Sequence, residues 1–536
     1  MSSGVDERRH LARSTATQTV LTGISRLTGF VRVVVVAAVL GTTFLGNTYQ
    51  SANMVPNIVF ELFAAGALQA VLVPALVARF DRGDDEGAER LAGSVLGLTL
   101  ALLGGLAVLG ALASPLLMRG LVSGVEDPAI RADQVALGTV FLLIFLPQIV
   151  VYDVGLVATA VLHARGRFGL PAFAPAVNNV VVCAAYGLFW WMRRDEGPSL
   201  DLSALEIAVL AGGTTLGVVA FCALPIVGAH RTGFRFRPNL DRSDPALRAL
   251  ARQGGWAALF LAMTQVQLVA VLVLGNPVEG GIVGYQVAFT FFLLPHALFA
   301  LPVLNTLFPE AARRAQAGDP EGVSLTVERG VRAIGFFVLP VAAGLIALAG
   351  PLTSIALFGE TGAAGAELVR RSLVGFAPGL IGYGLFYFLA RILYALDDTR
   401  TPALVHAAVV LGGVLGMVGG AAATEGDARI AALAWAHTGT YLAGAMLLGI
   451  VVHRRLRPHP RVLRPLAAGT ATAAVAGVAM AAVADRVGGD SRAAAVGAVL
   501  AAGGVGVPVY LGLQQLLGVT RVTTVVQLIR PGGGRG

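Results

Sequence analysis

The sequence predicts an all-α integral membrane protein with about 14 transmembrane helices. Of its 536 residues, 56% are hydrophobic and only 13% are charged, whereas soluble domains carry about 25% charged residues. The mean hydropathy is +0.76, and 14 apolar stretches reach the roughly 20 residues that a membrane helix needs. This composition excludes a soluble enzyme, a disordered chain and a nucleic-acid-binding protein, because a soluble fold of this length needs more charge on its surface.

The predicted spans follow one another from the N-terminus, separated by short polar loops. The first, at 16–40, follows a polar, basic N-tail and is too long for a signal peptide, so we interpret it as a retained helix. The second and tenth spans contain polar residues and are less regular than the others. The complete set is 16–40, 50–78, 92–118, 134–161, 171–192, 205–228, 249–275, 282–308, 328–350, 370–395, 402–422, 429–451, 464–484 and 493–518.

The arginine distribution supports this number of spans and orients the chain. All 39 basic residues are arginines. With the N-terminus in the cytoplasm, 27 of them fall in or beside the N-tail, the even-numbered loops and the C-tail, and 9 fall in the opposite loops. Cytoplasmic loops of membrane proteins carry an excess of Lys and Arg. We therefore expect a multi-pass protein of the cell inner (plasma) membrane with cytoplasmic N- and C-termini, and no nucleic-acid partner.

Two segments 235 residues apart repeat one another. Leu72–Gly87 and Leu307–Gly322 share seven of sixteen residues, and they form the cytoplasmic exits of the second and the eighth span. Spans 1–6 and 7–12 therefore resemble two copies in parallel orientation, an architecture of transporters that handle substrate between two halves; the alternative is coincidence in apolar sequence. The predicted domains are a cytoplasmic N-tail (1–14), an N-lobe (15–230), an inter-lobe cytoplasmic loop (231–248), a C-lobe (249–455), two further helices (456–520) and a cytoplasmic C-tail (521–536).

The sequence contains no motif of a known enzyme class. There is no P-loop, HExxH, CxxC or GxSxG pattern. The eight histidines are scattered, and Cys183 and Cys222 lie inside apolar stretches. We therefore expect no catalytic residue, no metal, no cofactor, no disulfide framework and no ATP-driven pumping by this chain.

The first span contains two arginines, Arg26 and Arg32, with Gly29 between them. An arginine at membrane depth costs at least about 2.5 kcal/mol and normally faces a bundle interior or an aqueous cavity. Six residues of helix place the two guanidinium groups about 9 Å apart along the axis. Because arginine binds phosphate in a bidentate manner, the pair indicates a cavity for a phosphorylated, anionic substrate, with Ser25 beside it. The alternative is that a side chain snorkels to the cytoplasmic interface.

Polar residues in other spans complete the candidate site. Pro56 can bend the second span, and Asn57 and Glu61 lie one turn apart on it. Glu61 either pairs with one of the two arginines, which makes it structural, or lines the cavity. Arg391, near the cytoplasmic end of the tenth span, suits a snorkelling or interface role. Further polar residues at depth, which usually hydrogen-bond neighbouring helices, are Asp153, Asn178, Asn179, Gln265, Gln267 and Gln286.

Four segments together resemble a known family. They are Ser25–Arg32, Val55–Ala67 with Val73-Pro74, Arg167–Pro175 with Asn178, and Tyr394–Pro402. In this order along the chain they resemble the MurJ (MviN) lipid II flippase family of the MOP (multidrug/oligosaccharidyl-lipid/polysaccharide) transporter superfamily. The combination is more specific than any one segment.

This resemblance implies a fold of two six-helix lobes, with two C-terminal helices that bound a groove for a polyprenyl tail. It also implies a cationic central cavity for the diphosphate-sugar headgroup of lipid II, and flipping by alternating access. The first-helix arginines of the family correspond to Arg26 and Arg32. We therefore predict as substrate-binding residues Ser25, Arg26, Gly29, Arg32, Asn57, Glu61, Asn178 and Gln286.

Several positions depart from the family pattern. Many members have an Asp where Asn47 stands, a basic pair at Phe60-Glu61, and a cavity Arg where Thr290 aligns. The seventh and eleventh spans contain no carboxylate, so a sodium site of the kind proposed for some members is not expected. The cavity is thus expected to be less cationic than in many relatives. We predict as gate or interface positions Asn47, Pro56, Thr290 and Arg391.

The predicted function is that of a non-enzymatic flippase, which moves the undecaprenyl-diphosphate-linked peptidoglycan precursor lipid II across the cytoplasmic membrane. The expected partners of this monomer are the lipid-linked anionic substrate, membrane lipids and cell-wall synthesis proteins. One alternative is a MOP-type exporter of another lipid-linked glycan or a small amphiphile, for which Glu61 or Asp153 would be the coupling carboxylate. Another is a non-transporting scaffold in cell-wall assembly.

Overall fold

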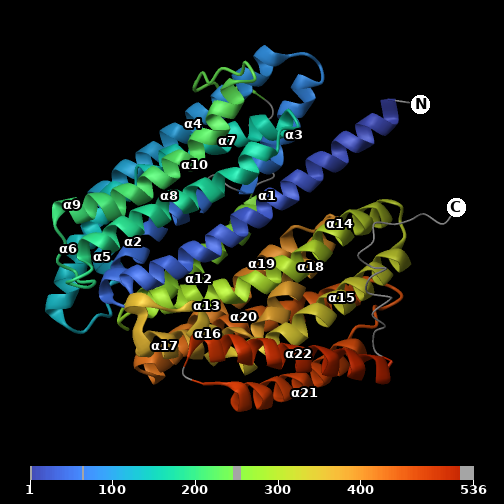
Figure 1. The fold of residues 1–536 in the computed structure, drawn as a ribbon. Helices are drawn as coiled ribbons and strands as arrows, with labels where there is room; N and C mark the ends of the chain where they lie inside the picture. The colour runs from blue at the N-terminus through green and yellow to red at the C-terminus, as the bar shows by residue number, and fades with distance from the viewer. Residues whose placement is uncertain (1–2, 63–65, 245–254, 490, 519–536) are drawn as a thin grey trace. The chain divides into compact units, whose positions relative to one another are not determined.

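The computed structural model describes residues 3–62, 66–244, 255–489 and 491–518, and all regular secondary structure within these ranges is helical. The chain forms two compact units, residues 1–265 and 266–536. In Figure 1 the first unit runs from blue to green and the second from green to red. The predicted domain boundaries stay a prediction, and the two units are described separately below.

The first unit consists of long helices joined by short turns, several with side-chain caps. Thr43 accepts a hydrogen bond from the Gly46 amide at the start of α2, and Asp127 accepts one from Ala129 at the start of α6. The elements are α1 (Ser3–Leu40), α2 (Phe44–Phe60), α3 (Gly66–Phe80), α4 (Asp85–Leu112), α5 (Ser114–Leu121), α6 (Pro128–Phe145), α7 (Gln148–Ala164), α8 (Gly169–Arg193), α9 (Ala204–Ile207), the π-helical turn η2 (Ala208–Gly212) and α10 (Gly213–His230).

The second unit has the same kind of elements and two additional long helices at its C-terminal end. The boundary between the units lies inside its first helix, α12. The elements are α12 (Gly255–Gly275), α13 (Gly281–Pro295), the π-helical turn η3 (His296–Ala300), α14 (Leu301–Gln316), α15 (Pro320–Ala347), α16 (Ala349–Ala356), the 3-10 turn η4 (Gly359–Thr361), α17 (Gly362–Phe376), α18 (Gly379–Ala395), α19 (Arg400–Ala423), α20 (Gly426–Arg455), α21 (Leu463–Val487) and α22 (Arg492–Leu516).

The described residues contain 12 helices that are long and apolar enough to cross a membrane, or 13 if the bent pair 359–376 and 379–395 is one span. The predicted second span corresponds to α2 and α3, and residues 63–65 between these helices lie outside the described residues. The count of 14 therefore stays a prediction. The all-helical membrane fold itself is confirmed.

Several predicted spans are interrupted in the structure, among them 370–395, which is divided between α17 and α18. The span predicted at 134–161 consists of α6 and α7, separated by a turn at Pro147, which starts α7 and lacks the amide that would continue α6. The span predicted at 92–118 ends as α4 at Leu112, and α5 follows with a proline in its first turn. Hydropathy alone does not show such breaks, because the flanking residues are apolar.

Several helix pairings recur in the two units. In the first unit α2 packs on α6, α4 on α7, α7 on α10 and α8 on α10. The second unit repeats these pairings as α13 on α17, α15 on α18, α18 on α20 and α19 on α20. The packing therefore follows the duplication that the sequence predicted.

The repeated sequence segments fold into the same turn. Gly83 and Gly318 have φ of 71° and 68°, in the left-handed region that favours glycine. The next residue in each case, Asp84 or Asp319, caps the following helix by accepting a hydrogen bond of 2.8 Å from an amide three residues on. The identities in this repeat therefore encode a helix end and a helix start.

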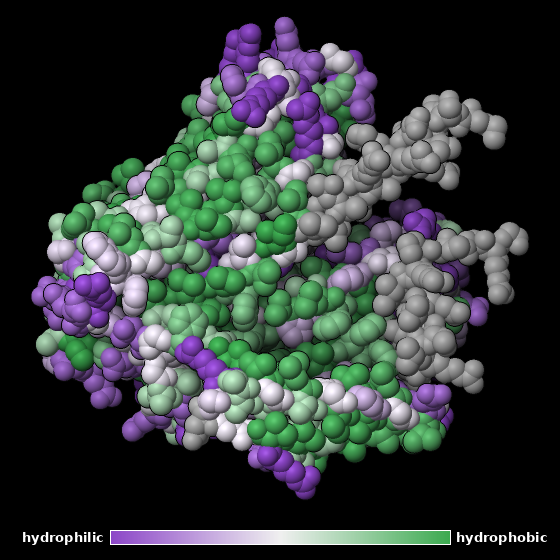
Figure 2. Space-filling view, viewed as in Figure 1, coloured by the Kyte–Doolittle hydropathy of each residue, from purple (hydrophilic) through white to green (hydrophobic). Residues whose placement is uncertain are grey.

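The helices expose many apolar side chains. Leu112, Leu415 and Val478 are each more than 70% exposed. Figure 2 shows apolar residues over much of the visible helical surface and polar residues gathered at helix ends and loops. A soluble protein rarely exposes such large apolar areas, so this surface suits contact with lipid.

Candidate substrate cavity

The first unit contains a cavity of about 400 Å³. It lies among α1, α2, α7, α8 and α10, so it is formed by helices that are distant in sequence. The lining is mixed, with one cation, amide and hydroxyl groups, and apolar side chains. The lining residues are Arg32, Asn53, Asn57, Tyr152, Pro175, Asn178, Thr214, Val218 and Phe221.

Arg32 is the charged residue of this lining. Its side chain is half-buried on α1, and no carboxylate of the described residues lies within ion-pair distance of its guanidinium group. Its charge acts electrostatically on the hydroxyl groups of Tyr152 and Tyr186. A guanidinium group that is partly desolvated and lacks a protein counter-ion favours an anionic ligand.

Three asparagines give the cavity uncharged hydrogen-bonding groups. The side-chain amide of Asn57 donates to the backbone carbonyl of Asn53 at 2.9 Å, which fixes the Asn57 side chain against α2. The Oδ1 atom of Asn178 is buried and has no hydrogen-bond partner among the described residues. Such a buried acceptor is normally satisfied in a working site. This oxygen lies against Gly217 on α10, so a bound ligand meets the Asn178 side chain at the other atoms of its amide group, which lines the cavity.

A buried hydroxyl network supports the wall of the cavity. The Tyr49 hydroxyl lies 2.6 Å from the Tyr186 hydroxyl and 2.6 Å from Thr214 Oγ1. Tyr49 is fully buried against Phe141 and Phe145, in edge-to-face contact with both rings. The network ties α2, α8 and α10 together and holds the hydroxyl of Thr214 at the lining.

The other predicted residues of the first span lie outside this lining. Arg26 is exposed and forms no ion pair within the described part of the chain. Gly29 faces α8, where a Cβ atom would lie 3.6 Å from the Asn179 amide nitrogen. The Ser25 carbonyl accepts hydrogen bonds from Thr28 and Asn179, of 3.0 and 3.4 Å. The structure therefore separates Arg32 from Arg26, Ser25 and Gly29.

The predicted residues of the second span are divided in the same way. Pro56 lies buried in α2, and Asn47 is fully buried near the start of that helix. Glu61 follows α2, is half-buried and is absent from the cavity lining. It forms no ion pair with Arg26 or Arg32 in the described structure. The structural pairing considered for Glu61 is therefore not seen.

Three predicted residues belong to the second unit. Gln286 and Thr290 lie one turn apart on α13, and the Thr290 hydroxyl donates to the Gln286 carbonyl at 2.8 Å. Arg391, near the end of α18, donates to Asn305 Oδ1 on α14 at 2.8 Å and lies over the Phe308 ring. The guanidinium group of Arg391 thus joins two helices within its unit.

Six lining residues were not among the predicted site residues: Asn53, Tyr152, Pro175, Thr214, Val218 and Phe221. The last three follow the i, i+4, i+7 spacing of one helical face. That spacing was visible in the sequence, but an apolar face with one threonine is equally typical of helix packing. Only the neighbouring helices show that this face meets a cavity.

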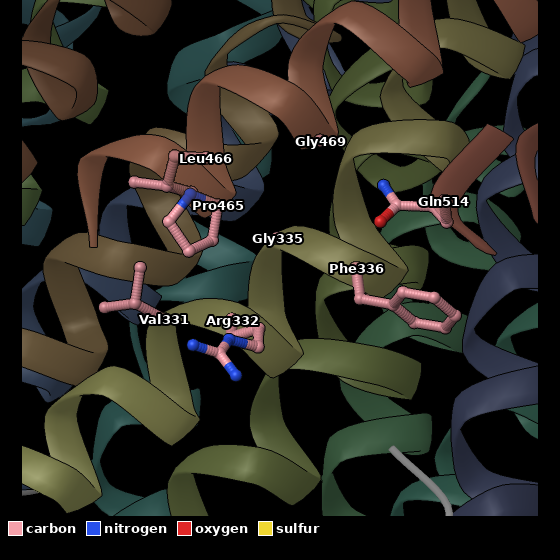
Figure 3. A pocket seen from close by; sticks show the side chains of 8 residues that line it. All are labelled: Val331, Arg332, Gly335, Phe336, Pro465, Leu466, Gly469 and Gln514. Atoms are coloured by element: carbon pink, nitrogen blue, oxygen red, sulfur yellow. The ribbon is translucent and has the colours of Figure 1, made fainter. Parts of the chain in front are cut away.

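A second, much smaller recess lies in the second unit, between α15 and the C-terminal pair α21–α22 (Figure 3). Arg332, Phe336 and Gln514 are among its lining residues. The Tyr510 hydroxyl on α22 donates to the Phe336 carbonyl on α15 at 2.9 Å, and Gln514 donates to Thr472 on α21 at 2.8 Å. Its volume of about 10 Å³ holds about one water molecule, so it is a packing seam rather than a substrate site.

The larger cavity suits recognition of a polar, anionic headgroup. The described residues contain no group of three or more His, Cys, Asp or Glu side chains that could hold a metal ion. The lining instead offers one guanidinium group for phosphate, and amides and hydroxyls for sugar or peptide groups. These are features of binding rather than of covalent chemistry.

Comparison with known proteins identifies the family. Residues 36–490 match the protein family described as "Lipid II flippase MurJ". The chain belongs to the lipid II flippase MurJ family. Among curated MurJ relatives, the "Probable lipid II flippase MurJ" of Rhizobium meliloti (strain 1021) is 28% identical over 383 residues, which are 70% of this chain and 69% of that protein. The relative from Vibrio cholerae serotype O1 is 25% identical over 402 residues, 74% of each chain.

Solved structures show the same fold. The structure "Lipid II flippase MurJ, inward closed conformation" is 19% identical, covers 96% of this chain and 99% of its own, and has a TM-score of 0.74. An inward-facing multidrug resistance MATE transporter of the MOP superfamily is 14% identical, covers 82% of this chain and 94% of its own, and has a TM-score of 0.65. The predicted family is thus confirmed by the family match, and the two solved structures share the fold of this chain.

Proposed function

We propose that this chain is a lipid II flippase of the inner membrane and that the cavity of the first unit binds part of the lipid II headgroup. The observation that carries the site is Arg32, a half-buried guanidinium group without an ion-pair partner within the described residues, in the wall of a cavity of about 400 Å³. The membership of the chain in the lipid II flippase MurJ family supports the substrate.

In this proposal Arg32 binds the diphosphate of lipid II. A guanidinium group donates two parallel hydrogen bonds to phosphate oxygens, and desolvation in the membrane strengthens this contact. The amide groups of Asn57 on α2 and Asn178 on α8 then bind sugar or peptide groups. The remaining predicted residues, including Arg26, Glu61 and Gln286, stay candidates for other steps of the same path.

Translocation follows by alternating access, without covalent change of the substrate. Binding drives such a change only if the substrate has different affinities for the two states. The arginine distribution supports cytoplasmic N- and C-termini, so we propose that the headgroup enters from the cytoplasmic side. The polyprenyl tail stays in the lipid, beside the exposed apolar faces of the helices.

Substitution of Arg32 tests the site. We expect Arg32→Gln to weaken lipid II binding to the purified protein by about tenfold or more, because charge-assisted hydrogen bonds contribute roughly 1.5–3 kcal/mol. Arg32→Lys keeps the charge but loses bidentate geometry, so we expect an intermediate affinity. Binding is measured with labelled lipid II, and function by growth of a strain depleted of its own lipid II flippase.

A matched substitution controls for loss of positive charge. Arg194 is 60% exposed at the side chain, lies at the end of α8 and is outside the lining, so Arg194→Gln should bind and complement as the unaltered protein does. Full binding and growth by Arg32→Gln at normal protein levels would rule out the proposed site. If a cationic dye binds to the cavity and unlabelled lipid II does not, the result would point to the drug-export alternative.

A further inference from the structure

Asp153 is a fully buried carboxyl group that the cavity does not use. It lies in the middle of α7 with 0% of its surface exposed. Tyr152, the preceding residue, faces the cavity, and consecutive helical residues point about 100° apart. Asp153 is therefore directed to another side of α7. The contact between α4 and α7 is called the α4–α7 seam below. Val95 and Leu96 on α4 and Val157 on α7 belong to one apolar cluster there.

The hydroxyl of Thr99, on α4, is the hydrogen-bond partner of Asp153. Thr99 Oγ1 lies 2.8 Å from Asp153 Oδ2 and 2.9 Å from the Val95 carbonyl oxygen. The hydroxyl has one hydrogen, and a carbonyl can only accept. If Asp153 is protonated, it donates to Thr99, and Thr99 donates to Val95, so both contacts are hydrogen bonds. If Asp153 is ionised, the single hydrogen of Thr99 must be shared between two acceptors.

The surroundings of Asp153 contain nothing that compensates a negative charge. Its second oxygen, Oδ1, is buried without a hydrogen-bond partner in the described structure, and no cation lies within ion-pair distance of it there. An isolated buried carboxylate is strongly disfavoured and becomes neutral instead. Protonation therefore accounts for this arrangement.

The helices that pack on α7 are α2, α3, α4 and α10. Of their titratable groups, Cys222 on α10 contacts α7 at Gly155, where its sulfur lies 2.7 Å from the position of a Cβ atom. Gly155 and Asp153 point about 200° apart on the helix, so Cys222 lies on another side of α7 than Asp153. No ion pair or hydrogen bond joins any of them to Asp153 in the described structure. Burial and the hydrogen bond with Thr99 are the influences that act on its carboxyl group. The titratable groups on these helices and at the end of α2 are Tyr49, Glu61, Arg79, Asp85, Glu86, Glu89, Arg90, Cys222 and His230.

A metal cation does not suit this position. Hard cations take about six or more oxygen ligands, whereas Asp153 has one hydroxyl neighbour on α4 and an otherwise apolar seam. The chemistry of the site is therefore that of a proton, which needs one acceptor.

We propose that Asp153 is a proton-binding site that couples translocation to a proton gradient. The proposal rests on the proposed lipid II flippase function. With the proton bound, an O–H bond of Asp153 completes the chain to Thr99 and the α4–α7 seam stays closed, as observed. When the seam opens toward one side of the membrane, water on that side takes the proton from the carboxyl group. The ionised Asp153 then disfavours closure until it binds a proton from water on the other side, so one proton crosses the membrane in each cycle. Because Asp153 and Tyr152 are adjacent on α7, a shift of this helix at the seam moves the cavity wall.

The protonation state is tested without any transport assay. Infrared difference spectra between the purified protein and Asp153→Asn should show the carbonyl stretch of a protonated carboxylic acid at pH 7. Thr99→Val, which removes the acceptor, should shift this band. The control Asp133→Asn removes an exposed carboxyl group of α6 and should leave the band in place. A wild-type spectrum in which Asp153 contributes only carboxylate bands overturns the proposal.

Coupling is tested in proteoliposomes with the membrane potential held at zero. For one proton per lipid, the steady-state distribution of labelled lipid II between the leaflets should shift by about tenfold per unit of imposed pH difference. Asp153→Asn should still equilibrate lipid II but ignore the gradient. An unchanged gradient response in Asp153→Asn contradicts the coupling. Absence of any translocation by the unaltered protein contradicts the flippase function instead, and the spectra remain decisive for Asp153.

Discussion

At the scale of single residues, the two arginines of the first helix have different surroundings. Arg32 lines the cavity and is half-buried, whereas Arg26 is exposed and lies outside the lining. Six helical residues rotate the two side chains about 120° apart. Only one of the two, Arg32, therefore faces the cavity of the first unit. The spacing was readable in the sequence, but the position of the cavity around the helix was not.

Gly217 on α10 gives Asn178 the room to face the cavity. A Cβ atom at Gly217 would lie 2.6 Å from Asn178 Oδ1 and 2.5 Å from a Val182 methyl carbon, closer than real contacts allow. We therefore predict that Gly217→Ala displaces the Asn178 side chain and lowers lipid II affinity several-fold, by roughly the 1 kcal/mol of one hydrogen bond. The affinity of purified protein for labelled lipid II measures this effect.

Gly187 on α8 is the matched control, because a Cβ atom there meets no atom within 4 Å. Gly187→Ala should keep full affinity and raise thermal stability slightly, since alanine is the better helix former. Equal affinities for Gly217→Ala and Gly187→Ala would show that Asn178 does not contribute to binding.

At the scale of elements, one ionic contact joins the α18–α19 turn to the end of α20. Asp398 accepts hydrogen bonds from the Thr401 amide and hydroxyl, at 2.8 and 2.6 Å, and pairs with Arg455 at 2.6 Å. Burial by itself raises the pKa of Asp398. The hydrogen bonds from Thr401 and the charge of Arg455 outweigh it and hold the pKa below its ordinary value.

A lowered pKa in the folded state means that the ionised form stabilises the fold. We predict that Asp398→Asn lowers the apparent melting temperature at pH 7 by roughly 2–4 °C, which corresponds to about 1 kcal/mol for a unit of this size. This stabilisation is fully present above the unfolded-state pKa of about 3.9 and disappears as the pH falls through the folded-state value. The difference between the two proteins should therefore shrink below about pH 4.

Asp397 provides the control for this pH dependence. It is exposed and has a φ of 59°, a conformation that asparagine also tolerates. Asp397→Asn should leave the melting temperature nearly unchanged at every pH. A deficit in Asp398→Asn that persists unchanged at low pH would mean that the charge of Asp398 is not the cause.

At the scale of the whole molecule, the arginine distribution predicts the orientation in the membrane. We predict that a cysteine at Asp81, in the turn after α3, reacts with a membrane-impermeant thiol reagent from the cytoplasmic side only. A cysteine at Ser123, after α5, should react from the opposite side only; both positions are exposed. The measurement uses a background in which Cys183 and Cys222 are replaced by alanine, and labelling of both positions from the same side would refute the topology.

Much of the architecture could be predicted from the sequence. The segments around Gly83 and Gly318 revealed the duplication, because the same Gly-Asp turn is needed wherever a helix ends and the next begins. Apolar stretches identified the helices, because a bilayer requires long runs of apolar residues. The breaks at Pro147 and after Leu112 escaped this reasoning, since residues on both sides of each break are equally apolar.

The sequence alone determined the fold class, the family resemblance and the presence of a deep arginine for an anionic substrate, because each depends on the chemical nature of residues along one chain. Only the tertiary structure decided which polar residues meet. It placed Arg32 beside Asn57, Asn178 and Thr214 in one cavity, and it enclosed Asp153 at a seam with Thr99. These choices depend on how the helices rotate and pack against one another. Helix rotation and packing are set by contacts between segments far apart in sequence, which no single-span pattern contains.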